Sequence, residues 1–301
     1  MLTDGGIETR LIYEFNLDLP EFASFLPLVR PGQRWALEAI YRSYLEIAAE
    51  TQLPMQLGTP TWRAHPDCLA RLGFGHADDL ARINGAAVRL LHDLRRDMGL
   101  EYLIAIAGVI GPRRDGYDPA EAPSPEVARA YHSIQAEMLA ELGVDLLYAP
   151  TFASAAELEG VAAAMAAAGL PYALAPIIDA GARMLDGTPL AEAIARIDAR
   201  VKPAPQHYLI GCVHPTLFRE AYQNGPSLTA AVAGRIAGLK ANASTLPPDQ
   251  LDRLDHLEAG LPQLFGEQMA DLHRRYGLTV LGGCCGTDHR HIRAIAEALL
   301  G

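Results

Sequence analysis

Short apolar runs recur along the whole chain, and segments with helically spaced apolar residues separate them. Eight such runs can be distinguished: Met1 to Asp4, Leu53 to Pro60, Tyr102 to Gly111, Val144 to Phe152, Tyr172 to Asp179, His207 to Pro215, Ile236 to Ala243 and Leu278 to Gly283. Runs that are apolar throughout are typical of strands covered on both faces of a parallel sheet. We therefore expect eight buried strands.

The segments between these runs carry the periodicity and the end signals of helices. Apolar residues lie three or four positions apart in two clear cases: Val88, Leu91, Leu94 and Met98, and Val127, Tyr131, Ile134 and Met138. Ser124-Pro125 offers an N-cap followed by a first-turn proline, and Ser154-Ala-Ala-Glu157 has the pattern of a capping box. Gly143 and Gly169 stand where helices are expected to end.

Eight strands that alternate with helices favour a (β/α)8 barrel, in which a parallel sheet closes on itself. An open, doubly wound sheet is the rival fold. The barrel is favoured because there are eight units, and because the unusual residues follow the strands, where barrels carry their chemistry. No break in composition suggests two domains, so residues 1–301 are expected to form one domain. Leu17 to Pro31 and Ser244 to Pro262 are expected to be long loops over the barrel mouth.

Composition and charge restrict the partners that this chain can have. Half of the 301 residues are hydrophobic and a fifth are charged, which is enough apolar material for a large core. A net charge of −11 without a basic cluster argues against nucleic acid or an anionic membrane as a partner. The stretch from Val161 to Leu170 is too short to span a bilayer, and no signal peptide is apparent. We expect a cytoplasmic protein with small-molecule partners, and homo-oligomerisation stays open.

Three cysteines follow two of the expected strands. Gly282-Gly-Cys-Cys-Gly-Thr287 places Cys284 and Cys285 at a strand end, and its glycines permit the sharp bend that lets both thiolates face one point. Cys212 ends an equivalent apolar run. Three thiolates suit a zinc ion with one open position, which deprotonates an incoming thiol and leaves it electron-rich. We therefore predict a zinc site formed by Cys212, Cys284 and Cys285.

The three cysteines could instead be structural, form a redox dithiol or belong to a zinc hydrolase, and each alternative predicts a different sequence feature. A buried Cys212 beside an accidental cysteine pair would be structural only. A redox dithiol would more usually have the CxxC spacing. A zinc hydrolase would need a general base near the metal, and the sequence has neither paired carboxylates nor an HExxH motif. Cys68, at an expected helix start, receives no role.

Candidate substrate residues follow other strands. Asp4 ends the first run and Gly5 follows it, so a carboxylate and bare backbone could approach a substrate ammonium group there; an ordinary turn is the alternative. Trp62 follows the second run and, with Tyr148 in the fourth, could offer an aromatic face to a cationic methyl donor. Packing of Trp62 under a loop is the alternative.

Two polar residues near strand ends leave their roles open. His214 could be a fourth metal ligand or an orienting group, or it could be an ordinary hydrogen-bonded loop histidine. Asn242 could bind a carboxylate or orient a loop, and nothing in the spacing decides between them.

The chain ends resemble a known family. Gly282-Gly-Cys-Cys-Gly-Thr287, followed by His291-Ile-Arg-Ala-Ile-Ala-Glu297, resembles the closing motif of the homocysteine S-methyltransferase family, which includes betaine-homocysteine and S-methylmethionine-dependent enzymes. Asp4-Gly-Gly and Cys212-Val-His-Pro215 are similar to two further segments of that family. The resemblance implies a zinc (β/α)8 barrel of methionine biosynthesis in which Cys212, Cys284 and Cys285 hold the metal. It also implies that an acceptor thiol takes the open position and that Asp4 helps to hold its amino group.

Two positions depart from the family pattern. Gly211 stands where the family usually has asparagine before the first zinc cysteine, and Pro150 stands where it typically has a glutamate that binds the homocysteine amino group. Either Glu8 or another mouth residue substitutes, or the acceptor is a different thiol. The expected function is zinc-dependent methyl transfer from a sulfonium or quaternary ammonium donor to homocysteine or a related thiol. The alternative is a zinc-binding barrel of the same family that acts as a sensor, carrier or hydrolase.

Overall fold

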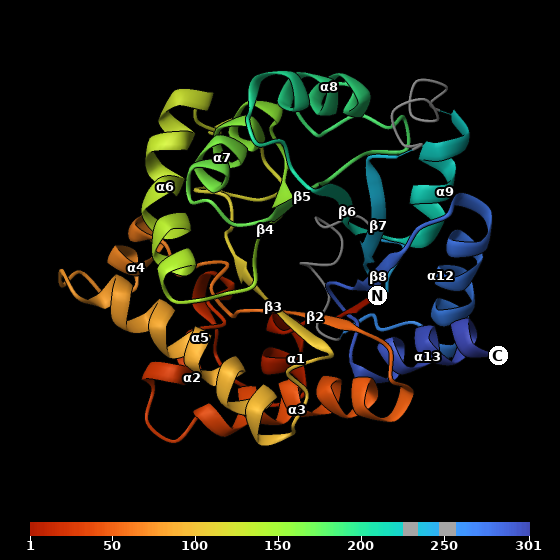
Figure 1. The fold of residues 1–301 in the computed structure, drawn as a ribbon, viewed down its shortest axis with the longest axis horizontal. Coiled ribbons are helices and arrows are strands. Elements are labelled where there is room, and N and C mark those ends of the chain that lie inside the picture. Colours follow the sequence, from red (N-terminus) through yellow and green to blue (C-terminus); the bar gives the residue numbers. More distant parts are fainter. Residues whose placement is uncertain (225–233, 247–256) are drawn as a thin grey trace.

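The computed structural model describes residues 1–224, 234–246 and 257–301. In these ranges parallel strands pair in chain order and close into a barrel, as predicted (Figure 1). The strands are β1 (Leu2–Thr3), β2 (Met55–Gly58), β3 (Ile104–Val109), β4 (Leu146–Phe152), β5 (Tyr172–Pro176), β6 (His207–Val213), β7 (Ile236–Ala241) and β8 (Val280–Gly283). Each of the eight predicted runs contains one of them, and the doubly wound alternative is excluded because β1 pairs with β8.

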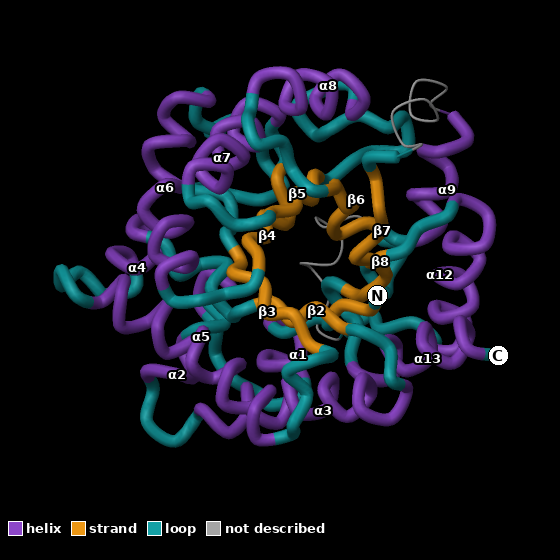
Figure 2. Tube along the Cα trace, in the orientation of Figure 1, coloured by secondary structure: helices purple, strands orange, loops and turns teal. Residues whose placement is uncertain are grey.

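Helices surround the strands, as the tube view shows (Figure 2). The helices are α1 (Glu8–Tyr13), η1 (Pro20–Phe22), α2 (Leu26–Val29), α3 (Arg34–Thr51), α4 (Pro66–Arg71), α5 (Asp79–Asp97), α6 (Pro125–Glu141), α7 (Ala155–Ala167), α8 (Leu190–Arg200), α9 (Pro215–Asn224), α12 (Pro262–Tyr276) and α13 (His289–Leu300). None of the helices in the described ranges combines the length and apolar character that a bilayer crossing requires.

Alternation along the strands divides the buried side chains between two cores. Leu57, Ile106 and Leu147 belong to the large core between the barrel and its helices. Tyr148 and Leu209 belong to a smaller cluster with small residues from neighbouring strands. Side chains therefore fill the barrel interior, as is usual for this fold, and leave the strand ends free to carry the site.

Two predicted N-caps form, but one capping box does not. The hydroxyls of Ser124 and Ser154 accept hydrogen bonds from backbone N–H groups at the starts of α6 and α7. Glu157, however, accepts from the backbone N–H of Arg113 at 2.8 Å and lies 3.0 Å from His132 Nε2. The capping-box prediction was wrong because these buried partners draw the carboxylate away from the helix start. Their need for an acceptor is a tertiary feature that local spacing does not reveal.

Helix α6 forms where predicted but buries a different face from its apolar stripe. Val127 and Ile134 are exposed, whereas His132 and Gln135 are buried. Gln135 Nε2 donates to two backbone carbonyls of the loop after β2, at 3.0 and 3.1 Å. A Cβ on Gly160 of α7 would lie 2.4 Å from the Cβ of Ala128 in α6, so small residues bring the two helices close together.

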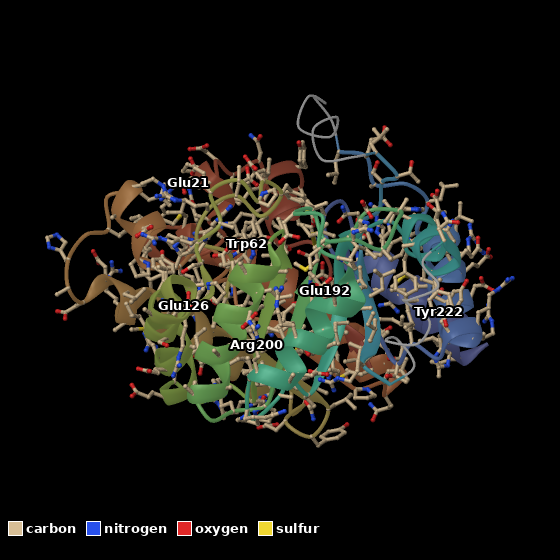
Figure 3. All side chains as sticks on the ribbon, turned by 90° about the horizontal axis from the view of Figure 1, so that it is seen from above. Glu21, Trp62, Glu126, Glu192, Arg200 and Tyr222 are labelled. Atoms are coloured by element: carbon tan, nitrogen blue, oxygen red, sulfur yellow. A yellow bond between two sulfur atoms is a disulfide. The ribbon has the colours of Figure 1, made fainter. Side chains whose placement is uncertain are left out.

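The two long segments expected over the mouth have different outcomes. Leu17 to Pro31 contains η1 and α2, and α2 packs on α3 and α5. Glu21 of this segment lies toward the same end of the barrel as Trp62, with Arg200 nearer the other end (Figure 3). In the segment from Ser244 to Pro262, residues 247–256 lie outside the described ranges, so the prediction of a loop there is not tested as a whole.

Candidate metal centre and active site

The three predicted cysteines meet at the C-terminal ends of β6 and β8. The Sγ atoms of Cys212, Cys284 and Cys285 all lie within 4.8 Å of one another, the one such cluster of potential metal ligands within the described ranges. Cys212 and Cys284 are joined as a disulfide in this structure. Metal binding requires them as thiolates. A set of three thiolates fits zinc, which favours soft sulfur ligands in tetrahedral sites and can keep a fourth position for a substrate.

An irregular backbone directs Cys212 toward this cluster. The pairing of β6 with β7 shifts register between Gly211 and Val213, and Cys212 has a φ of +53°. Such bulges re-aim side chains next to active sites, and a left-handed non-glycine residue needs support from its surroundings. Asn242 supplies that support, because its Nδ2 donates to the carbonyl of Cys212 at 2.8 Å. The geometry therefore matches the loop-orienting use of Asn242.

Thr151, which the sequence did not single out, touches the same cysteine. It follows Pro150 at a register shift in β4 and has a φ of +67°. Its Oγ1 lies 3.4 Å from Cys212 Sγ, and both residues are buried. When Cys212 is a thiolate, the hydroxyl is the donor, and this hydrogen bond stabilises the anion and orients it.

The loop that carries Cys284 and Cys285 is held by the end of β7 and by a side chain of its own. Cys284 N–H donates to Ala241 O at 2.7 Å, and Ala243 N–H donates to Cys285 O at 3.0 Å. Thr287 Oγ1 donates to Cys284 O at 2.7 Å. Backbone bonds to β7 and a local side-chain bond thus fix the direction of both cysteines.

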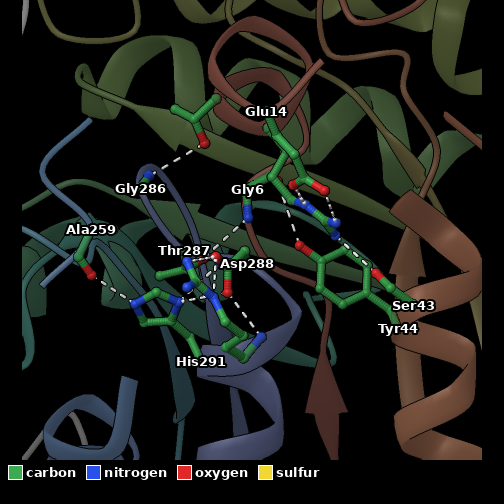
Figure 4. Close-up of polar contacts among 12 residues, drawn as sticks. Gly6, Glu14, Ser43, Tyr44, Ala259, Gly286, Thr287, Asp288 and His291 are labelled. Atoms are coloured by element: carbon green, nitrogen blue, oxygen red, sulfur yellow. Dashed lines mark hydrogen bonds and ion pairs between the residues drawn. The ribbon is translucent and has the colours of Figure 1, made fainter. Parts of the chain in front are cut away.

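The glycines after Asp4 allow the first and last loops of the barrel to pack together. A Cβ on Gly5 would lie 2.7 Å from the Tyr44 hydroxyl and 2.8 Å from Thr287 Oγ1. Gly6 N–H donates to Thr287 O at 3.1 Å (Figure 4). Gly5 was expected to let the backbone approach a ligand, but in the structure the close approach is to its own chain.

A capping box that the sequence analysis missed fixes the start of α13. Asp288 accepts from the backbone N–H of Arg290 at 2.8 Å, and Asp288 N–H donates to His291 Nδ1 at 3.1 Å. His291 Nε2 donates to Ala259 O at 2.7 Å, so this imidazole is bonded at both nitrogens (Figure 4). The loop that carries Cys284 and Cys285 therefore continues into a firmly anchored helix.

Asp4 is placed at the mouth, but both of its carboxylate oxygens are bound by the chain itself. Oδ2 accepts from Gly58 N–H at 2.6 Å, and Oδ1 forms an ion pair with Lys240 Nζ. Asp4 is only 2% exposed. This geometry differs from the expected contact with a substrate ammonium. Lys240 was missed, although a single charge within the apolar run Ile236 to Ala243 was a signal for it.

Glu8 and Pro150, the two positions considered for the acceptor's amino group, have different surroundings. Glu8 is partly exposed at the start of α1, and burial raises the pKa of its carboxyl, which the charge of Asp4 reinforces and Lys240 opposes. Pro150 contributes only its carbonyl, which accepts from Trp62 Nε1 at 3.3 Å. Glu8 therefore remains a candidate for contact with a cationic group.

The aromatic candidates are only partly open to a ligand. The guanidinium carbon of Arg63 lies 4.1 Å from the centroid of a Trp62 ring, so the protein's own cation uses one face. A Cβ on Gly111 would lie 2.7 Å from Trp62 Cδ1, which shows how closely the loop after β3 packs on this indole. Tyr148 is 1% exposed, and burial raises the pKa of its phenol far above its usual value.

His214 does not join the cysteine cluster. Its Nδ1 lies 2.7 Å from Thr216 Oγ1 and accepts from Thr216 N–H at 3.2 Å, at the start of α9. Burial lowers the pKa of this imidazole to about 4. The ordinary alternative, a hydrogen-bonded loop histidine, is the one that the geometry matches.

The contact of Thr151 with Cys212 predicts an effect on metal affinity. Thr151→Val keeps the β-branched shape and removes the hydroxyl, so zinc affinity should fall about 10- to 100-fold, the usual range for lost outer-shell partners. Competition with a chromophoric chelator measures this. Thr151→Ser keeps the hydroxyl and should stay near wild type; equal affinities for the valine and serine variants would contradict the role of the hydroxyl.

Comparisons with known proteins agree with this geometry. A family model described as homocysteine S-methyltransferase matches residues 1–299. The homocysteine methyltransferase MmuM from Escherichia coli is structurally similar in its oxidized form, with a TM-score of 0.76, 22% identity, and coverage of 99% of this chain and 95% of that chain. Its metallated form gives a TM-score of 0.76 at 20% identity, and its apo form 0.66 at 21%, with the same coverage.

A search of curated proteins finds no significant match. The structural likeness, at these identities, establishes a shared fold, whereas the family model covers nearly the whole chain. The chain therefore belongs to the homocysteine S-methyltransferase family and is a methyltransferase.

Proposed function

We propose that this protein is a zinc-dependent thiol S-methyltransferase that transfers a methyl group from a sulfonium or quaternary ammonium donor to homocysteine or a related thiol. The observation that carries the proposal is the convergence of Cys212, Cys284 and Cys285, whose sulfurs lie within 4.8 Å of one another at the strand ends. Membership of the family supports the same chemistry.

The three cysteines would hold the metal as thiolates. Zinc, when bound, supplies the Lewis acidity that lowers the pKa of an acceptor thiol. Three thiolate ligands leave the centre with net negative charge, which favours a reactive sulfur nucleophile over an acidic water. Thr151 and Asn242 hold Cys212 from its sulfur and its carbonyl, respectively. Their role is to keep the ligand set in one geometry.

The protein must also align the acceptor sulfur with the methyl group of the donor. A methyl group on a positively charged sulfur or nitrogen is displaced in line, and the donor leaves as a neutral molecule, so the leaving group needs no general acid. Correct placement of the two reactants is then the main contribution of the protein. Trp62 lies at the rim and packs on the interior cluster that contains Tyr148, while Glu8 offers a carboxylate for the acceptor's amino group.

A metal-dependent product assay tests the proposal. Reduced protein is loaded with zinc and offered homocysteine and other thiols with S-methylmethionine, S-adenosylmethionine or betaine, and mass spectrometry detects the methylated thiol. We expect product with at least one pair, and its loss after a chelator removes the metal. A protein that binds zinc stoichiometrically but methylates no thiol would contradict the proposal, as would ester or amide hydrolysis without a methyl donor.

A further inference from the structure

Lys240 lies inside the barrel, next to the strands that carry the metal cysteines. It pairs in register with Gly211 of β6 and Gly282 of β8. Gly211 immediately precedes Cys212, and Gly282 lies two residues before Cys284. Neighbouring strands are only about 5 Å apart. A short molecule whose sulfur reaches the cysteine cluster therefore has the rest of its chain within reach of Lys240.

The ammonium of Lys240 has unused hydrogen-bonding capacity. Its side chain is 12% exposed, and Asp4 is its one hydrogen-bond partner in the described part of the chain. An ammonium has three donor protons. The ring centroid of Tyr148 lies 5.9 Å from Lys240 Nζ. Lys240 thus faces both Asp4 and Tyr148 with donors to spare.

Tyr148 provides a second, independent sign of a ligand. Its hydroxyl is buried and has no hydrogen-bond partner among the described residues. A buried hydroxyl without a partner is destabilising, so such groups usually have a partner in the working protein. Ammonium and phenol groups both donate to an oxyanion. The two side chains together suit a carboxylate.

We propose that Lys240 and Tyr148 bind the carboxylate of the acceptor, which is a short-chain mercaptocarboxylate, and that Asp4 is a positioning residue that holds Lys240. The proposal rests on the proposed function for the identity of the ligand as a thiol. A substrate ammonium is disfavoured at this position, because Lys240 already neutralises Asp4 and would repel a second cation. Lys240 offsets the negative charge of Asp4, and the N–H of Gly58 donates a hydrogen bond to it. Asp4 therefore does not prevent an anion from binding beside Lys240.

The carboxylate is assigned to the acceptor rather than to the donor for a geometric reason. The acceptor's sulfur must reach the cysteine cluster, and Lys240 lies on the strand between the two that carry the cysteines. An α-amino group on the acceptor would bind at a different position, where Glu8 is the nearby carboxylate. Recognition of the carboxylate is therefore separable from recognition of the amine.

Three acceptors of matched length test this assignment: homocysteine, 4-mercaptobutanoate and 3-aminopropane-1-thiol. With wild-type protein, we expect the two carboxylates to have kcat/KM values roughly 10- to 100-fold above the amine-only thiol, the range for hydrogen bonds to charged groups. Lys240→Met combined with Asp4→Asn removes both charges and leaves no buried carboxylate unpaired. This double variant should lose the preference, whereas Lys240→Arg should retain most of it.

A binding measurement keeps the test independent of turnover. Calorimetry of the thioethers methionine, 4-(methylthio)butanoate and 3-(methylthio)propan-1-amine should show the same carboxylate preference and the same loss in the double variant. Tyr148→Phe, which keeps the ring, should weaken carboxylate binding severalfold. Thermal unfolding followed by circular dichroism verifies that each variant is folded.

The outcomes separate this inference from the proposed function. A wild-type preference for the amine-only ligand, no binding of any ligand, or a carboxylate preference that survives in the folded double variant would overturn the inference. Carboxylate binding that depends on Lys240, without methylation of any thiol, would support the subsite and refute the methyltransfer. Methylation of a thiol without any preference for carboxylate ligands would support the methyl transfer and refute the carboxylate subsite.

Discussion

Replacing Cys285 with serine is expected to remove zinc and to lower methyl transfer at least about 1,000-fold. A bound metal supplies several kcal/mol of charge stabilisation, and each 1.36 kcal/mol corresponds to a factor of ten in rate. Cys285 is chosen because its loss leaves Cys212 and Cys284 intact, so only the third thiolate is removed. Metal content by mass spectrometry and initial rates with a saturating donor measure the two effects.

Cys68 provides a matched control for this substitution. It is fully buried outside the cluster, and burial raises the pKa of its thiol to about 12, so it is a poor source of thiolate. Cys68→Ser should keep one equivalent of zinc and wild-type rates. If Cys285→Ser also kept one equivalent, the three-thiolate centre would be wrong.

Asp4→Ala is expected to lower the free energy of unfolding by about 3 to 5 kcal/mol, the usual cost of removing one partner from a buried ion pair. The side chains of Asp4 and Lys240 are 3% and 12% exposed, so solvent screens the remaining charge poorly. The substitution also leaves the N–H of Gly58 without its acceptor. Urea denaturation followed by circular dichroism measures the change.

Two further variants identify the cause of that loss. Asp4→Asn keeps an acceptor for Gly58 and removes only the charge, so it should cost less than the alanine variant. Asp4→Ala combined with Lys240→Met removes the uncompensated ammonium and should recover part of the stability. A single Asp4→Ala variant within 1 kcal/mol of wild type would show that the pair is not essential to the fold.

The architecture was predictable because its signals are local. A run such as Tyr172 to Asp179 is apolar up to its last residue, and a parallel strand buried on both faces needs that pattern. The meeting of Cys212 with Cys284 and Cys285 was also predictable, because the carboxyl ends of parallel strands share one end of a barrel. In the first case the signal lies within one short run, and in the second it lies in two short segments whose meeting follows from the barrel order.

The missed features depend on residues that are far apart in sequence. Asp4 and Lys240 are separated by 236 positions, so no local spacing could show that they neutralise each other. Thr151 reaches Cys212 only because both strands shift register at their ends, and such bulges have no simple signature in a single sequence. The buried face of α6 was missed because Gln135 satisfies carbonyls of a loop about 70 residues earlier.

The packing of the first loop against the last has a consequence for biosynthesis. β1 has only β2 as a neighbour until β8 has been synthesised, and the Gly6 N–H finds its acceptor, Thr287, in the final helix-strand unit. A nascent chain would therefore leave the ribosome with two open sheet edges, which are prone to association with other chains. Closure of the barrel and completion of the three-cysteine cluster would be nearly simultaneous, so a translation product that ends before β8 would lack two of the three cysteines.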